Sequence, residues 1–189
     1  MRVFRLATGG LLTLSLIPAL ILSLVLGSPA VADVADYPAI KVTRVVASGL
    51  DTPWGLAFLP DGSALVSERD SGKIKRIDPR GRVGTNVTTV GRIKGVASAG
   101  EGGLLGIAVA IPQGSSAPVL FAYLTSRSDN RVVRVQLLKG GKRLGKQQPI
   151  VTRIPKATNH NGGRLLVGTD QTLFIATGDA GDPQSAQDR

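Results

Sequence analysis

The sequence predicts an all-β protein, and three observations support this prediction. Short apolar runs are separated by turns rich in glycine and proline, which number 24 and 11 in the 189-residue chain. This spacing is typical of many short strands joined by tight turns. No convincing helical periodicity follows the apolar N-terminal stretch. Three segments also resemble one another, and they begin at Gly55, Gly106 and Gly163.

The repeated segment has the order glycine, apolar strand, turn, apolar strand and polar loop. Its copies run over 55–78, 106–137 and 163–177, and their first glycines lie 51 and 57 residues apart. A repeat of about 50 residues built from short strands is the signature of a β-propeller, with one four-stranded blade per repeat. The alternative is a β-sandwich whose hairpins resemble one another by chance. The shared order of the three copies favours the propeller.

Residues 1–32 have the three parts of a secretory signal peptide. Two arginines precede an uncharged apolar run, and Ala30-Val31-Ala32 is a small-residue cleavage site. We expect cleavage after Ala32 and a partial β-propeller over 33–189, secreted or periplasmic, with no stable membrane insertion. The alternative is a retained membrane anchor, because the apolar run approaches the roughly 20 residues that span a bilayer. Pro18 and the cleavage site argue against the anchor.

The formal net charge of +10 raises the question of a nucleic-acid partner. Lysine and arginine are scattered along the chain, however, and aromatic residues make up only 4% of it. The densest basic cluster, which we interpret as a solvated loop, contains Lys139, Lys142, Arg143 and Lys146. We therefore expect no nucleic-acid binding. The chain has no cysteine, which excludes a disulfide framework, a thiolate metal site and a cysteine nucleophile.

His160, the one histidine of the chain, is the candidate general base. It lies in the polar loop 159–164, which leads into a predicted inner strand. Such loops face the central channel of a propeller, where ligands bind. An imidazole ordinarily titrates near neutral pH, which suits it to proton transfer. A single histidine is more often structural, and that alternative stays open on composition alone.

Two further glycine-rich turns carry carboxylates. Glu101 precedes the second predicted inner strand, at a position equivalent by repeat to the loop of His160. Asp179 and Asp182 lie three residues apart, where they either contact a cation through oxygen atoms or cap a strand as Asx turns. The Asx turn is the favoured interpretation because the spacing of an EF-hand is absent.

Four motifs, in this order, resemble the soluble quinoprotein glucose/sorbosone dehydrogenases. They are PWGLAFLPDG at 53–62, GEGGLLG at 100–106, NHNGGRL at 159–165 and GDAG at 178–181. Each motif is weak when taken singly, whereas the ordered set is specific. The resemblance covers nearly all of the chain that follows the signal peptide.

This resemblance implies a six-bladed β-propeller that binds pyrroloquinoline quinone (PQQ) and calcium. It implies oxidation of aldose sugars at C1, with hydride transfer to the quinone. On the motif match, His160 takes the position of the general base and Gln184 that of a residue near the quinone. Glu101 falls where well-known members have a glutamine lining the sugar site, and Asn159 replaces an aspartate beside the catalytic histidine. We therefore assign Glu101 and Asn159 to the sugar and Gln184 to PQQ.

The length after the signal peptide corresponds to about three blades. We therefore expect the chain to be the first part of a longer PQQ-dependent sugar dehydrogenase, and not to close a ring alone. Neither a metal ligand nor the main PQQ-binding cations are assigned within it, and the calcium ligands are expected beyond Arg189. The predicted partners are a small sugar and an external electron acceptor.

Two other functions are weighed against the dehydrogenase. One is a non-catalytic secreted propeller that binds carbohydrate or protein, since a fold does not dictate a function. The spacing of His160 and Gln184 disfavours it. The other is a propeller lactonase or metal hydrolase, which needs several oxygen ligands converging on one metal. Within these 189 residues the carboxylates do not gather in that way, but the further blades that we expect could supply the ligands.

Overall fold

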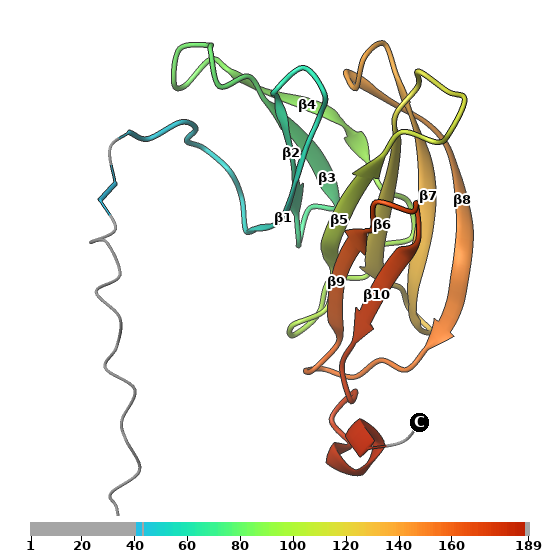
Figure 1. Ribbon diagram of the computed structural model, residues 1–189. Coiled ribbons are helices and arrows are strands. Elements are labelled where there is room, and N and C mark those ends of the chain that lie inside the picture. The colour runs from blue at the N-terminus through green and yellow to red at the C-terminus, as the bar shows by residue number, and fades with distance from the viewer. Residues whose placement is uncertain (1–40, 43, 188–189) are drawn as a thin grey trace, which may run out of the picture. The chain divides into compact units, whose positions relative to one another are not determined.

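A computed structural model describes residues 41–42 and 44–187 of the chain, and the described residues from Val42 onward belong to one compact unit. The predicted signal peptide at 1–32 lies outside the described residues. The described part consists of ten strands and one 3-10 helix, Pro183–Gln187 (Figure 1). None of its helical structure is long and apolar enough to cross a membrane. The prediction of an all-β protein with little helix is confirmed.

The first sheet contains four antiparallel strands that are paired in sequence order. They are β1 (Pro53–Phe58), β2 (Ala64–Glu68), β3 (Lys73–Ile77) and β4 (Val87–Arg92). The tight turn between β1 and β2 is stabilised by Asp61, whose Oδ1 accepts hydrogen bonds from Ser63 N at 3.0 Å and Ser63 Oγ at 2.6 Å. Aspartate is favoured in such turns because its side chain bonds to the backbone two residues on.

The second sheet repeats this topology, and a two-stranded hairpin follows it. The sheet contains β5 (Leu104–Ala110), β6 (Val119–Thr125), β7 (Asn130–Leu138) and β8 (Arg143–Ile154). The hairpin contains β9 (Gly162–Val167) and β10 (Leu173–Thr177). The predicted repeat is therefore confirmed, with its third copy represented by two described strands.

The sequence pattern located the inner three strands of each blade and missed the outer strands β4 and β8. Both outer strands lie at sheet edges, where about half of the side chains are exposed, so no apolar run marks them. The interpretation of the basic cluster as a loop was wrong for Arg143 and Lys146, which lie in β8. Charged side chains are common on edge strands, where they oppose pairing with another chain.

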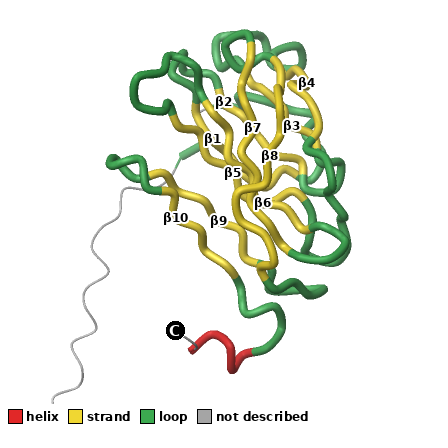
Figure 2. Tube along the Cα trace, turned by 90° about the vertical axis from the view of Figure 1, so that its right-hand side faces the viewer, coloured by secondary structure: helices red, strands yellow, loops and turns green. Residues whose placement is uncertain are grey.

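The two sheets and the hairpin are stacked side by side, as blades of a propeller are. The innermost strands β1, β5 and β9 are neighbours in this order, and the outer strands β4 and β8 also meet (Figures 1 and 2). The repeated glycines explain this close approach. A Cβ at Gly55 would lie 2.9 Å from backbone atoms of β5, and a Cβ at Gly106 would collide with the carbonyl oxygen of Gly163 in β9.

The apolar core lies between the stacked sheets. One cluster fills the space between the first and second blades and includes Leu65, Ile74, Leu120 and Val133, all nearly inaccessible to solvent. A second cluster joins the other face of the second blade to the hairpin through Leu105, Tyr123, Val132 and Leu165. Burial of these side chains is the main favourable contribution to folding. The second blade is thus covered on both faces.

Candidate active site

The inner strands β1, β5 and β9 all begin at the same end of the stacked sheets, which we call the rim. The loop before β5, the connection from β8 to β9 and the segment after β10 lie at this end, the lower one in Figure 1. The rim therefore brings together the three polar loops that were singled out in the sequence. Glu101 N donates a hydrogen bond of 2.8 Å to Thr158 O, which ties the first of these loops to the second.

His160 is held at the rim by two carboxylates. Its ring Nδ1 lies 2.9 Å from Asp179 Oδ1, and its backbone N donates a hydrogen bond of 2.7 Å to Glu101 Oε2. Its φ is 55°, in the left-handed region that few residues other than glycine adopt. The imidazole side chain is 54% exposed and so is accessible to a substrate. A strained backbone at an exposed polar residue is common where function requires the geometry.

Asp179 reaches His160 because of the register of the hairpin. Thr177 pairs with Gly162, and continuing this pairing by two residues sets Asp179 opposite His160. Asp179 Oδ1 also accepts a hydrogen bond of 2.9 Å from Gly181 N, so the predicted Asx turn is confirmed. The sequence analysis missed the pairing of Asp179 with His160, which the register of a hairpin closed at the turn 168–171 could have indicated.

The hydrogen bonds to Asp179 stabilise its ionised form. The bond from Gly181 N, together with that from His160, holds the pKa of the Asp179 carboxyl below its ordinary value, against the opposing effect of desolvation. Asp179 is therefore an anion at neutral pH and accepts a proton-bearing nitrogen. A neutral His160 then carries its hydrogen on Nδ1 and leaves Nε2 with a free lone pair.

The other residues assigned from the sequence lie at different distances from this pair. Glu101 contacts the loop of His160 directly, through the backbone hydrogen bond already described. Asn159 is exposed beside it, and its Oδ1 faces the turn at Gly181. Gln184 lies in the 3-10 helix, and among the described residues its side chain makes no hydrogen bond with the loop of His160.

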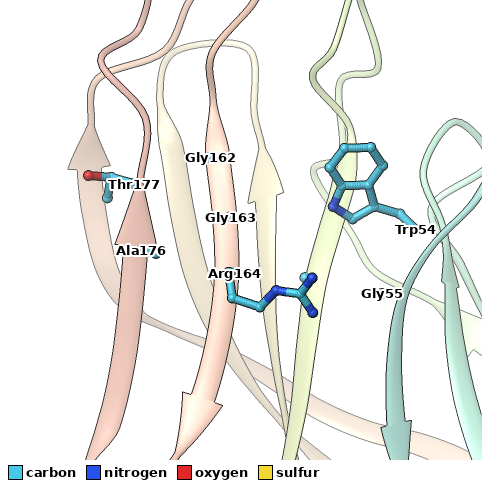
Figure 3. Close-up of a pocket in the computed structure, with 8 residues that line it drawn as sticks. Trp54, Gly55, Gly162, Gly163, Arg164, Ala176 and Thr177 are labelled. Carbon is cyan, nitrogen blue, oxygen red and sulfur yellow. The ribbon is translucent and has the colours of Figure 1, made fainter. Parts of the chain in front are cut away.

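A cavity of about 370 Å³ lies against the inner strands, and two of its lining residues, Gly162 and Thr177, are two positions from His160 and Asp179 in the sequence. Most of the residues that line the cavity have small side chains. The lining residues are Trp54, Gly55, Gly106, Gly162, Gly163, Arg164, Ala176 and Thr177. Figure 3 shows the Arg164 guanidinium extending across the inner strands toward the Trp54 indole. The cavity thus offers one flat aromatic side chain and one cation.

The described residues contain no group of three or more histidine, aspartate or glutamate side chains placed to hold a metal ion. Calcium stays a prediction.

Comparisons with known proteins find one family model and several relatives. A family model described as glucose/sorbosone dehydrogenase matches residues 50–189. The quinoprotein glucose dehydrogenase B of Acinetobacter calcoaceticus is 29% identical over 153 residues, and the aldose sugar dehydrogenase YliI of Escherichia coli is 27% identical over 158. The PQQ-bound aldose sugar dehydrogenase of Streptomyces coelicolor superimposes with a TM-score of 0.71 and 46% identity over 79% of this chain.

The chain spans less than half the length of these proteins. It covers 32% of the Acinetobacter protein, 42% of the Escherichia protein and 44% of the Streptomyces structure.

Proposed function

Because the chain belongs to the glucose/sorbosone dehydrogenase family, we propose that it supplies the proton-accepting part of a PQQ-dependent aldose dehydrogenase. The observation that carries this proposal is the His160–Asp179 pair at the rim, with Nδ1 and Oδ1 2.9 Å apart. A histidine oriented by an ionised carboxylate is a common arrangement for general base catalysis.

His160 removes a proton from the C1 hydroxyl of the sugar through Nε2. Asp179 keeps the ring in the tautomer that leaves Nε2 unprotonated, and it stabilises the imidazolium that forms. Loss of the hydroxyl proton and of the C1 hydride converts the cyclic sugar to a lactone. PQQ, when bound, supplies the quinone that accepts the hydride. Glu101 and Asn159 contact the sugar hydroxyls beside His160 in this proposal.

The described residues fit part of a site for PQQ, a planar aromatic molecule that carries carboxylates. Trp54 offers a flat surface, Arg164 offers a cation, and the glycine-lined wall leaves about 370 Å³ free. A single arginine does not balance several carboxylates, so further cations are required as well. Gln184 belongs to the cofactor side of the site in this proposal.

Turnover with deuterated sugars tests the reaction. PQQ-loaded protein is given glucose carrying deuterium at C1 or at C2, with an external dye as electron acceptor. Breaking of the C1–H bond predicts slower reduction of the dye with the C1-deuterated sugar and an unchanged rate with the C2-deuterated one. Equal rates with both sugars, or formation of product without dye reduction, would contradict oxidation at C1.

Export is the second part of the proposal, and it rests on the pattern at 1–32. The mature protein acts outside the cytosol and passes electrons to an external acceptor. N-terminal sequencing of the protein recovered outside the cytosol should begin at Asp33. Recovery of an intact N-terminus in the membrane fraction would instead support the retained anchor.

A further inference from the structure

Three polar side chains are buried beneath the loop that carries His160. They are Tyr123 in β6, Asn130 at the start of β7 and Asn161, which follows His160 directly. Tyr123 and Asn130 are inaccessible to solvent, and Asn161 is 2% exposed. Buried polar groups are costly unless their hydrogen bonds are made, so the bonds of these three side chains show what the arrangement fixes.

Asn161 is bonded on both sides of its amide. Its Oδ1 accepts hydrogen bonds from Asn130 Nδ2 at 3.0 Å and from Ala157 N at 3.1 Å, and its Nδ2 donates one of 2.9 Å to Ala157 O. Its backbone carbonyl accepts a hydrogen bond of 2.9 Å from Tyr123 Oη. The residue next to His160 is therefore fixed through both its side chain and its main chain.

Asn130 connects this loop to the second blade. Its Nδ2 donates a second hydrogen bond, of 2.7 Å, to Pro155 O, and its Oδ1 accepts one of 2.7 Å from Thr125 Oγ1. All of these partners lie in the second blade or in the loop. The blade and the loop meet because β6 and β9 are neighbours in the fold. The loop is thus anchored at both of its ends to the blade that is covered on both faces.

The anchored residue adjoins the strained one. His160 has a φ of 55°. It is held at the rim by Glu101, by the Asp179 carboxylate, which is 20% exposed, and by Ala180 N, which donates a hydrogen bond of 3.1 Å to His160 O. Solvent competes for the exposed contacts with Glu101 and Asp179. Asn161, by contrast, is 2% exposed, and its bonds to Tyr123 and Asn130 are buried. The buried side chains therefore fix the residue that follows His160 and support the backbone of His160 from below.

We propose that Tyr123, Asn130 and Asn161 are positioning residues that aim the His160 ring so that Nδ1 meets Asp179 and Nε2 faces the channel. The catalytic role of this positioning rests on the proposed function, while the geometry of the positioning does not. The three residues touch neither sugar nor cofactor. They act through the backbone of His160, and their loss changes which ring nitrogen carries the proton.

The tautomer of His160 tests this directly, because the chain has one histidine. Protein labelled with ¹⁵N-histidine is prepared at alkaline pH, where an imidazole is neutral, and is then studied by solid-state NMR. Wild type should show only the Nδ1–H form. Asn161→Ala and Asn130→Ala should show both forms, and Tyr123→Phe, which keeps the ring volume, should show the Nε2–H form as a minor signal.

Ser63→Ala is the matched control. It removes another fully buried hydroxyl, from the end of β2 away from the rim, where Ser63 Oγ accepts a hydrogen bond of 3.0 Å from Arg76 Nε. It should lower the melting temperature and leave the Nδ1–H form unchanged. The proposal is overturned if Tyr123→Phe and any folded asparagine variant lower the melting temperature yet keep the pure Nδ1–H signal. Failure of the PQQ-loaded protein to oxidise sugar would contradict the proposed function but not this result.

Discussion

The second blade and the hairpin differ in how completely they are packed. Both faces of the sheet β5–β8 are covered, one by the first blade and the other by the hairpin. The hairpin β9–β10 buries one face only, and on its other face Leu166 is 61% and Phe174 56% exposed. The candidate base precedes the hairpin, whereas the bonds that fix the next residue, Asn161, come from the second blade. The candidate base thus adjoins the less covered element, while the buried bonds next to it come from the better covered one.

Truncation of one leucine in each region should give the largest difference. Leu120 in β6 is inaccessible to solvent and belongs to the core between the blades. Leu120→Ala should lower the free energy of unfolding by about 2–5 kcal/mol, because it leaves a cavity. Leu166→Ala removes an exposed side chain and should change it by no more than about 0.5 kcal/mol. Urea denaturation measures both, and similar losses would mean that the outer face of the hairpin is packed in solution.

A methyl group at Gly106 should separate the hairpin from the second blade. Its Cβ would collide with the carbonyl oxygen of Gly163, which belongs to the backbone and cannot turn aside. Gly106→Ala should cost about 1–3 kcal/mol of stability and should make 162–187 the first segment cut by protease.

Gly145→Ala in β8 is the control for that substitution. Its Cβ would meet only side-chain atoms of Gln136 and Leu138, at 3.1–3.2 Å, and these can shift. It should cost less and leave the cleavage pattern of the hairpin unchanged. Uniform resistance of Gly106→Ala to protease would show that the hairpin does not depend on this close approach.

The smallest effect is expected when acid protonates Asp70, which lies in the turn between β2 and β3. Hydrogen bonds from Arg69, Ser98 and Thr52 lower the pKa of Asp70 to about 2. Because the folded value lies below the unfolded one, near 3.9, its stabilisation is present above about pH 4 and is lost as the pH falls toward 2. Asp70→Asn should therefore weaken the acid dependence of the urea midpoint between pH 5 and 2.5, by a small amount because Asp70 is partly exposed. An unchanged dependence would assign the acid sensitivity to other carboxylates.

The same contrast explains how far the sequence could predict the fold. Alternating apolar runs and turn residues located the strands that face a core, because burial imposes that pattern on the residues themselves. The edge strands β4 and β8 pack on fewer neighbours and carry no such pattern, so they were missed. Gly55 and Gly106 were correctly identified as repeated features, although their reason, contact between neighbouring inner strands, required the structure.

The site was predicted in a similar, partial way. His160 and Glu101 came from motifs that are local in sequence, and the structure brings them within hydrogen-bond distance. The place of Asp179 in the candidate site depended on strand register. The places of Tyr123 and Asn130 depended on hydrogen bonds with Asn161, which is more than 30 positions away from each of them. Such long-range hydrogen bonds leave no local signal.

The central claim is that His160 accepts the proton when the sugar is oxidised, and rapid mixing of PQQ-loaded protein with glucose tests it most directly. The measured quantity is the rate at which the bound quinone is reduced, with PQQ affinity and melting temperature determined for the same proteins. His160→Ala and His160→Gln should each slow this reduction by at least about 10²-fold, the usual loss for a general base, while PQQ affinity changes little. Reduction at the wild-type rate in fully loaded His160→Ala protein would contradict the account.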